Sequence, residues 1–214
     1  MTMTDRKTSR RLPKKEFTGP FKGGADVELM LRVRDGDVEA FEKIYEHYKG
    51  PIGSFFYHLV WDQSLAEDFL QEVFLRLWRS APEYKPSGKF STYLFQIAKN
   101  FWLNERMKRL REPRISLDAP VEGRDEEYRL EVAGNVATPS TIMANAEMKA
   151  HVQEAIEYMP EKQRVTFVLS EFQGLKYEEI SEILEVPLGT VKSRMAGAER
   201  FLRAKLQKFY AEYR

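Results

Sequence analysis

The stretch "LKYEEISEILEVPLGTVKSRMAGAERFLRAKL" at residues 175–206 predicts two helices joined by a tight turn. Pro187 is expected to end the first helix, and Gly189 eases the start of the second. Thr190 then either caps the second helix or lies in its first turn. The apolar residues expected to bury the first helix are Ile180, Ile183 and Leu184. The pattern therefore predicts a helix-turn-helix.

The second helix of this stretch has one apolar and one basic side. Its apolar residues recur at helical spacing and predict a buried stripe of Val191, Met195, Ala198 and Leu202. The residues then expected to face away from the core are Ser193, Ala196, Gly197 and Arg200. Because Ala196 and Gly197 carry almost no side chain, part of that exposed surface is truncated.

A helix held by such a stripe can enter the major groove of DNA. Lys192 and Ser193 could reach base edges or phosphates, while Arg194, Arg200 and Arg203 could meet backbone phosphates. The alternative is a plain helical hairpin with a solvated basic face. The pattern favours DNA binding but leaves both interpretations open.

Upstream, "SLAEDFLQEVFLRLWRS" at residues 64–80 predicts an amphipathic helix. Ser64 and Glu67 have the spacing of a capping box at its start. The expected buried residues are Ala66, Phe69, Leu70, Val73, Phe74 and Leu77. The opposite side carries Asp68, Gln71, Glu72, Arg76 and Arg79. Taken alone, that polar side is best interpreted as a solvated surface.

A third helix is predicted at residues 90–111, where aromatic and basic residues alternate. The rings are Tyr93, Phe95, Phe101 and Trp102, and the cations are Lys89, Lys99, Arg106, Lys108 and Arg109. Rings that stack on bases, beside cations that follow the phosphates, are typical of single-stranded nucleic-acid binding. The alternative is that most of these rings belong to the core.

The whole chain is predicted to be all-α, with two small helical bundles joined by a flexible linker. Residues 1–24 are expected to be a disordered basic tail, and residues 25–112 the first bundle. Residues 113–142 are rich in proline and acid and have no helical period, so they are expected to be a flexible acidic linker. Residues 143–214 would form the second bundle, and because only eight residues follow Leu206, we expect no further domain.

Composition narrows the possible functions. The 214 residues contain no cysteine, which excludes disulfides, thiolate catalysis and cysteine-ligated zinc. No apolar run has the length of a membrane span, and the net charge of +1 means that nucleic acid could be attracted only by local patches. The three histidines have no metal-ligand spacing, and no catalytic motif is present. We expect no metal, no cofactor and no enzymatic activity.

Three motifs in this order resemble the bacterial RNA polymerase sigma factors, in particular the extracytoplasmic-function (ECF) branch of the sigma-70 family. They are "AEDFLQEVFLRLW" (66–78), "FSTYLFQIAKNFWLNERMKR" (90–109) and "MPEKQRVTFVLSEFQGLKYEEISEILEVPLGTVKSRM" (159–195). The resemblance extends from about Asp26 to Leu206. It implies a cytoplasmic protein that binds core polymerase, recognises promoter DNA and initiates transcription of a specific regulon.

The resemblance also implies roles for individual residues. Those matching the docking face for the clamp helices of the polymerase beta-prime subunit are Asp68, Gln71 and Glu72. Those matching the segment that melts and holds the minus-ten element are Tyr84, Lys89, Tyr93, Lys99, Asn100 and Arg106. Tyr84 and Asn100 fall where the family forms a pocket for one extruded base. Those matching the readers of the minus-thirty-five element are Thr190, Lys192, Ser193, Arg194, Gly197 and Arg200.

Further partners implied by the resemblance are the polymerase beta subunit and an anti-sigma factor wedged between the two bundles. The linker would thread through the polymerase toward the RNA exit path. One departure is Tyr93, which stands where the family usually has tryptophan. The alternatives are a helix-turn-helix repressor or activator that does not bind polymerase, and a metal-dependent nuclease. The first would leave Asp68, Gln71 and Glu72 without a role.

Overall fold

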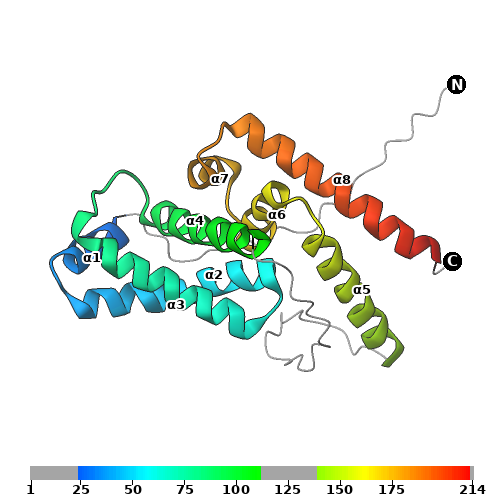
Figure 1. Ribbon diagram of the computed structural model, residues 1–214, viewed down its shortest axis with the longest axis horizontal. Coiled ribbons are helices and arrows are strands. Elements are labelled where there is room, and N and C mark those ends of the chain that lie inside the picture. Colours follow the sequence, from blue (N-terminus) through cyan, green and yellow to red (C-terminus); the bar gives the residue numbers. More distant parts are fainter. Residues whose placement is uncertain (1–23, 112–138, 213–214) are drawn as a thin grey trace, which may run out of the picture.

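The computed structural model describes residues 24–111 and 139–212 (Figure 1). Within those two ranges every regular element is helical and no strand occurs, which confirms the all-α prediction. The expected basic tail, apart from Gly24, and nearly all of the expected acidic linker lie outside the described residues. Among the described residues, no helix is both long enough and apolar enough to cross a membrane.

The first bundle consists of four α-helices and one short 3₁₀ turn. Its elements are α1 (Ala25–Arg34), α2 (Val38–Val60), α3 (Gln63–Ser80), η1 (Ala81–Glu83) and α4 (Phe90–Arg111). The predicted break at residues 35–37 is present, and Asp37 caps α2 by accepting a hydrogen bond from the backbone N–H of Ala40. Helix α2 continues through Pro51 and ends at Val60, and its C-cap residue Trp61 has a positive φ of 55°.

The start of α3 differs from the predicted capping box. Asp62 is the N-cap, and its carboxylate accepts a hydrogen bond of 2.8 Å from the backbone N–H of Leu65. Ser64 lies inside the helix, while Glu67 accepts a hydrogen bond from the side chain of Gln63. The prediction failed because Asp62 is an equally good cap placed two residues earlier.

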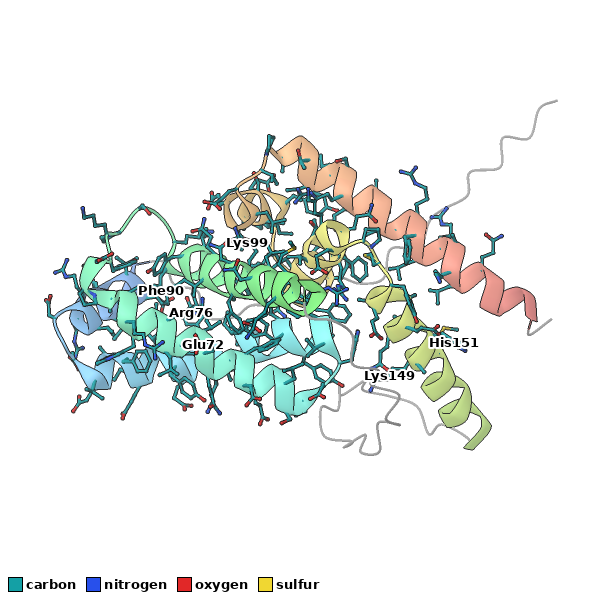
Figure 2. The ribbon with its side chains drawn as sticks, viewed as in Figure 1. Glu72, Arg76, Phe90, Lys99, Lys149 and His151 are labelled. Atoms are coloured by element: carbon teal, nitrogen blue, oxygen red, sulfur yellow. The ribbon has the colours of Figure 1, made fainter. Side chains whose placement is uncertain are left out.

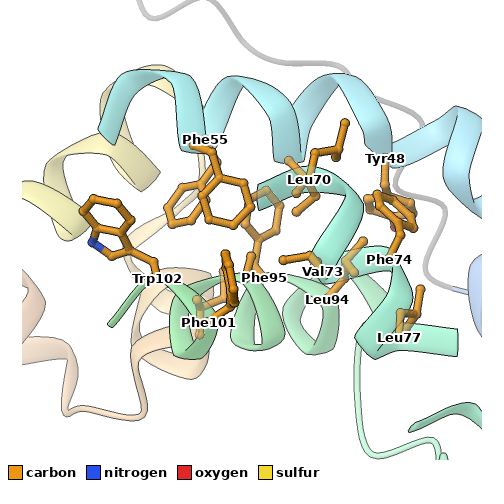
Figure 3. Packing of buried hydrophobic residues seen from close by; sticks show 14 of the residues in the cluster. Tyr48, Phe55, Leu70, Val73, Phe74, Leu77, Leu94, Phe95, Phe101 and Trp102 are labelled. Atoms are coloured by element: carbon orange, nitrogen blue, oxygen red, sulfur yellow. The ribbon is translucent and has the colours of Figure 1, made fainter. Parts of the chain in front are cut away.

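Aromatic rings fill the space between α2, α3 and α4 (Figure 3). Phe56 makes edge-to-face contacts with Phe69 and with Phe101, at centroid distances of 5.5 and 5.9 Å. Phe55 contacts Phe95 in the same manner at 5.8 Å. All six α3 residues predicted to be buried are buried. This aromatic layer fixes α3 and α4 against α2, so that each presents one remaining side to its surroundings.

The second bundle contains the predicted helix-turn-helix. Its elements are α5 (Pro139–Glu157), α6 (Glu161–Phe167), the π-helical turn η2 (Val168–Phe172), α7 (Tyr177–Leu184) and α8 (Leu188–Glu212). Helix α5 begins within the expected linker, a few residues before the predicted boundary. The turn between α7 and α8 contains Glu185 at a positive φ of 55°, and the Ser181 hydroxyl donates to the carbonyl oxygen of Val186.

The two bundles pack against each other in this structure. Figure 1 shows α7 beside α4 and α6 beside α8, in agreement with the contacts between these helices. The buried apolar side chains form one continuous cluster, which extends from Phe101 in α4 to Val168 in η2 and Ile183 in α7. At one edge of the joint, the His58 ring stacks on Phe172 with centroids 3.8 Å apart. The two bundles therefore pack directly against each other and are not joined only by the linker.

Candidate nucleic-acid interface

The second helix of the helix-turn-helix, α8, is anchored by its predicted stripe. Val191, Met195 and Ala198 are buried, and Leu202 is half-buried. The opposite side leaves Lys192, Ser193, Ala196, Arg200 and Arg203 exposed. The Ser193 hydroxyl donates to the Thr190 carbonyl oxygen at 2.9 Å, so it is oriented by its own helix. The exposed side is free to approach a groove, as the sequence predicted.

Three of the proposed minus-thirty-five residues lie at the border of that exposed side. Thr190 is half-buried in the first turn of α8, and Arg194 is half-buried as well. Gly197 is turned toward α6, where an added Cβ would lie 2.7 Å from Nε2 of Gln163. The expectation that Gly197 faces away from the protein is wrong. An added side chain at that position would have to displace the terminal amide of Gln163.

Helix α3 exposes the predicted polar side. Asp68 and Gln71 are exposed, while Glu72 is half-buried and accepts a hydrogen bond of 2.7 Å from Nε of Arg76. The guanidinium of Arg76 in turn lies over the Phe101 ring, 4.8 Å from its centroid (Figure 2). Glu72 is thus held by a neighbour, whereas the other two side chains are free to meet a partner.

The same helix also exposes apolar side chains that the sequence reasoning did not single out. Leu75 is 49% exposed and Trp78 is 39% exposed, and Trp78 makes an edge-to-face contact with Phe41. Leu75 lies one helical turn beyond Gln71, so the exposed side combines polar and apolar groups. The sequence carried this signal for Leu75, which falls outside the spacing of the six buried positions, but not for Trp78, which continues that spacing from Phe74.

Helix α4 buries most of the rings that could have stacked on bases. Phe95, Phe101 and Trp102 are at most 4% exposed and belong to the core. The interpretation of these three rings as a stacking surface is therefore wrong, and the alternative holds. Tyr93 is half-buried, and its hydroxyl lies 3.0 Å from that of Ser80. Tyr93 is the one ring of the proposed set that remains partly accessible.

The two residues of the proposed base pocket differ in exposure in this arrangement. The Tyr84 ring is 5% exposed and packs against Phe90 and Tyr93, and burial raises the pKa of its phenol. Asn100 is exposed on α4, seven residues beyond Tyr93 and thus about 10 Å further along the helix axis. The expectation that Tyr84 is open to an extruded base does not hold here. Asn100 remains accessible.

The three cations assigned to the minus-ten strand are all paired with glutamates of the second bundle. Lys89 Nζ lies 2.8 Å from Glu179, and Arg106 Nε lies 3.5 Å from Glu161. Lys99 Nζ lies 3.1 Å from Glu185, and Figure 2 shows Lys99 on the side of α4 that faces α7. Each of these cations therefore has an acidic partner within the protein.

The pairs differ in how deeply they are buried. The Lys99 side chain is only 7% exposed, whereas that of Lys89 is 55% exposed. The hydrogen bond from Lys89 to Glu179 raises the pKa of the lysine. Burial alone would raise the pKa of Glu179, but hydrogen bonds from Lys89 and the backbone N–H of Lys176 hold it below its usual value. The shifts agree that both groups are charged at neutral pH.

Glu161 joins the two bundles at the other end of α4. Its carboxylate accepts hydrogen bonds from the Trp102 indole N–H and from Arg164, and it also pairs with Arg106. Arg164 is 2% exposed, donates to the carbonyl oxygen of Glu157, and lies 5.5 Å from the Trp102 centroid. No sequence pattern predicted this cluster, because its members come from three helices.

Comparison with known proteins decides the family. Residues 44–112 match the family Sigma-70 region 2, and residues 150–202 match the family Sigma-70, region 4. The ECF RNA polymerase sigma factor SigW of Bacillus subtilis is 33% identical over 188 residues, covering 85% of this chain and 99% of that protein. The RNA polymerase sigma-H factor of Pseudomonas aeruginosa is 31% identical, covering 87% and 96%.

The chain belongs to the ECF RNA polymerase sigma factors. It is a promoter-recognising sigma factor, whose regions 2 and 4 serve binding to core RNA polymerase and promoter DNA. The alternative of a repressor or activator that does not bind polymerase is not favoured. Sigma factors are initiation factors and not enzymes by themselves. Among residues 24–111 and 139–212, no group of three or more histidines or carboxylates could hold a metal ion.

The fold of this sigma factor has solved counterparts. The structure of CnrH in complex with the cytosolic domain of CnrY aligns with a TM-score of 0.61 at 19% identity, covering 86% of this chain and 98% of that one. The sigma factor RpoE of Bartonella quintana, solved with the anti-sigma factor NepR, aligns with a TM-score of 0.58 at 20% identity. It covers 78% of this chain and 96% of that chain. Both likenesses concern the fold alone.

Proposed function

We propose that sides of three helices, α3, α4 and α8, carry separate functions of this sigma factor. The exposed side of α3 docks on the clamp helices of the polymerase beta-prime subunit through Asp68, Gln71 and Glu72. The polar side of α4 holds the minus-ten strand, and the exposed side of α8 reads the minus-thirty-five element. Because the protein acts with core polymerase, we place it in the cytoplasm, and region 4 would meet the beta subunit.

The observation that carries the α8 assignment is the separation of its two sides. The anchoring side chains are buried, while Lys192, Ser193 and Arg200 stand together in solvent. Lys192 and Ser193 are placed for base edges, and Arg200 with the half-buried Arg194 for phosphates. A solvated hairpin face would show the same exposure, so support for DNA binding comes from the family match of residues 150–202.

The docking assignment is tested with side chains that can be changed without disturbing the fold. Asp68→Lys with Gln71→Ala alters two exposed residues and leaves the Glu72–Arg76 pair intact. Competition with labelled wild-type protein for core polymerase measures the effect, and we expect the double variant to compete at least tenfold less well. Glu42→Lys, an exposed change of the same charge on α2, is the control. If the double variant, the Glu42→Lys control and the wild-type protein compete equally well, the proposed docking face is rejected.

We also propose that an anti-sigma factor binds this protein. The support is analogy: the solved relative from Bartonella quintana was captured with the anti-sigma factor NepR. The occupied joint between α4 and α7 limits where such a partner could insert. Affinity purification from native lysate tests the proposal. Repeated recovery of core polymerase without any other stoichiometric protein would contradict it.

A further inference from the structure

Two helices from different bundles face each other with opposite charge. Helix α4 and the residue before it present a row of two lysines with two neutral polar residues between them, Lys89, Thr92, Gln96 and Lys99, spaced three and four residues apart. Helix α7 and its C-cap present an acidic row, Glu179, Glu182 and Glu185, at every third residue. The two rows meet along their lengths rather than at one point.

Four polar contacts join these rows. The outer contacts are the ion pairs of Lys89 with Glu179 at 2.8 Å and of Lys99 with Glu185 at 3.1 Å. Between them, the Gln96 amide donates to the Glu182 carbonyl oxygen at 2.9 Å, and the Thr92 hydroxyl lies 3.4 Å from the Glu182 carboxylate. Regular contacts at successive turns indicate a matched pair of surfaces.

The contact between the two rows covers the side chain of Lys99. Its side chain is 7% exposed in the packed arrangement, and Glu185 supplies the carboxylate beside it. A buried ammonium group without such a partner is strongly unfavourable, so the acidic row makes the burial of Lys99 possible. A nucleic-acid strand cannot reach this ammonium group while α7 is in place.

Carboxylates and phosphates satisfy the same N–H donors by the same charge-assisted hydrogen bonds. We propose that the acidic row of α7 is an intramolecular competitor of the DNA strand, which closes the strand-binding side of α4 until the bundles separate. The proposal rests on the function proposed above for α4. It assigns to the first helix of the helix-turn-helix a regulatory role besides supporting α8.

The closure is selective for one of the DNA-binding surfaces. The exposed sides of α3 and α8, including Asp68 and Lys192, remain free in the packed arrangement. The closed protein can therefore meet core polymerase and duplex DNA, but it cannot hold a melted strand on α4. Strand capture would require separation of the bundles, which also breaks the stacking of His58 on Phe172.

The test neutralises the two outer glutamates of the acidic row without introducing a new charged side chain. Glu179→Gln with Glu185→Gln breaks both outer ion pairs, and glutamine can keep the capping bond to the backbone N–H of Lys176. Glu42→Gln with Glu178→Gln is the matched control, because both residues are exposed and the net charge rises equally. Lys99→Gln breaks the same buried pair from the α4 side.

The separation of the bundles is measured in the full-length free protein. Because the chain has no cysteine, Lys43→Cys and Ala204→Cys, one exposed position in each bundle, accept spin labels for pulsed EPR distances. Strand binding is measured with fluorescent oligothymidylate of about twelve nucleotides, a length within the site sizes of single-strand binders.

We expect the Glu179→Gln/Glu185→Gln variant to show longer distances than the control and to bind oligothymidylate several-fold more tightly. Two freed cations should steepen the salt dependence by about 1.4 in log–log slope. Lys99→Gln should lengthen the distances without the gain in affinity. Distances equal to those of the control would overturn the proposal. Longer distances without tighter binding by the glutamate variant would reject α4 as the strand site, and with it the competition.

Discussion

Ala196 and Gly197 are adjacent in α8, but they have different surroundings, so the edge of the proposed DNA-facing side falls between them. Ala196 is exposed, whereas Gly197 lies against Gln163 of α6. Consecutive residues on a helix are about 100° apart, so one step carries a side chain from solvent to a neighbouring helix. Glycine in a helix costs about 1 kcal/mol relative to alanine, and here the terminal amide of Gln163 occupies the space that a side chain would take.

This difference predicts opposite outcomes for arginine at the two positions. Ala196→Arg should strengthen binding to a duplex DNA fragment and steepen its salt dependence by about 0.9, the value for one added phosphate contact. Gly197→Arg must displace the Gln163 side chain, so it should lower the melting temperature without an equal gain in binding. Fluorescence anisotropy at several salt concentrations measures both. Equal affinities and slopes for the two variants would contradict the assignment.

At the scale of single elements, the start of α3 provides a clean comparison. Asp62 accepts the hydrogen bond of the Leu65 N–H, whereas Ser64, the cap predicted from the sequence, lies inside the helix. Asp62→Ala should cost about 1 kcal/mol, the usual value of an N-cap, and lower the melting temperature by about 2–4 °C. Ser64→Ala should be neutral or slightly stabilising because alanine is the better helix former. Thermal unfolding followed by circular dichroism distinguishes them, and a larger loss at Ser64 would restore the original prediction.

Helix periodicity explains both the success and the failure of the sequence analysis at this scale. The buried stripes of α3 and α8 follow from spacing within one helix, so Phe69, Val73 and Val191 were predicted correctly. The sequence also singled out Lys89 and Lys99 among the cations of this region, but it carries no information about what covers them. The partner, α7, is about ninety residues away in the chain. Such pairing appears only in the tertiary structure.

At the scale of the whole molecule, the joint between the bundles contains a histidine, His58. His58 of α2 stacks on Phe172, and its Nδ1 lies 2.7 Å from the Ser54 carbonyl oxygen. Burial lowers the pKa of His58, and the charge of Lys149 in α5 lowers it further. The hydrogen bond to Ser54 opposes both effects, but the pKa stays below its ordinary value. The packed arrangement therefore holds the ring neutral, with Nδ1 as the donor.

Separation of the bundles would expose His58 and return its pKa toward the ordinary value of about 6.5. Below that pH the open form binds more protons than the closed form, so acidification must favour opening. The closed-to-open ratio should fall by up to about tenfold between pH 7.5 and pH 5.5, because the open form is about nine-tenths protonated at the lower pH. Distances between labels on Lys43→Cys and Ala204→Cys report this ratio. His58→Gln should remove most of the pH dependence, whereas His47→Gln, in the first bundle beside Asp26, should retain it. An unchanged response in the His58 variant would mean that another group controls the joint.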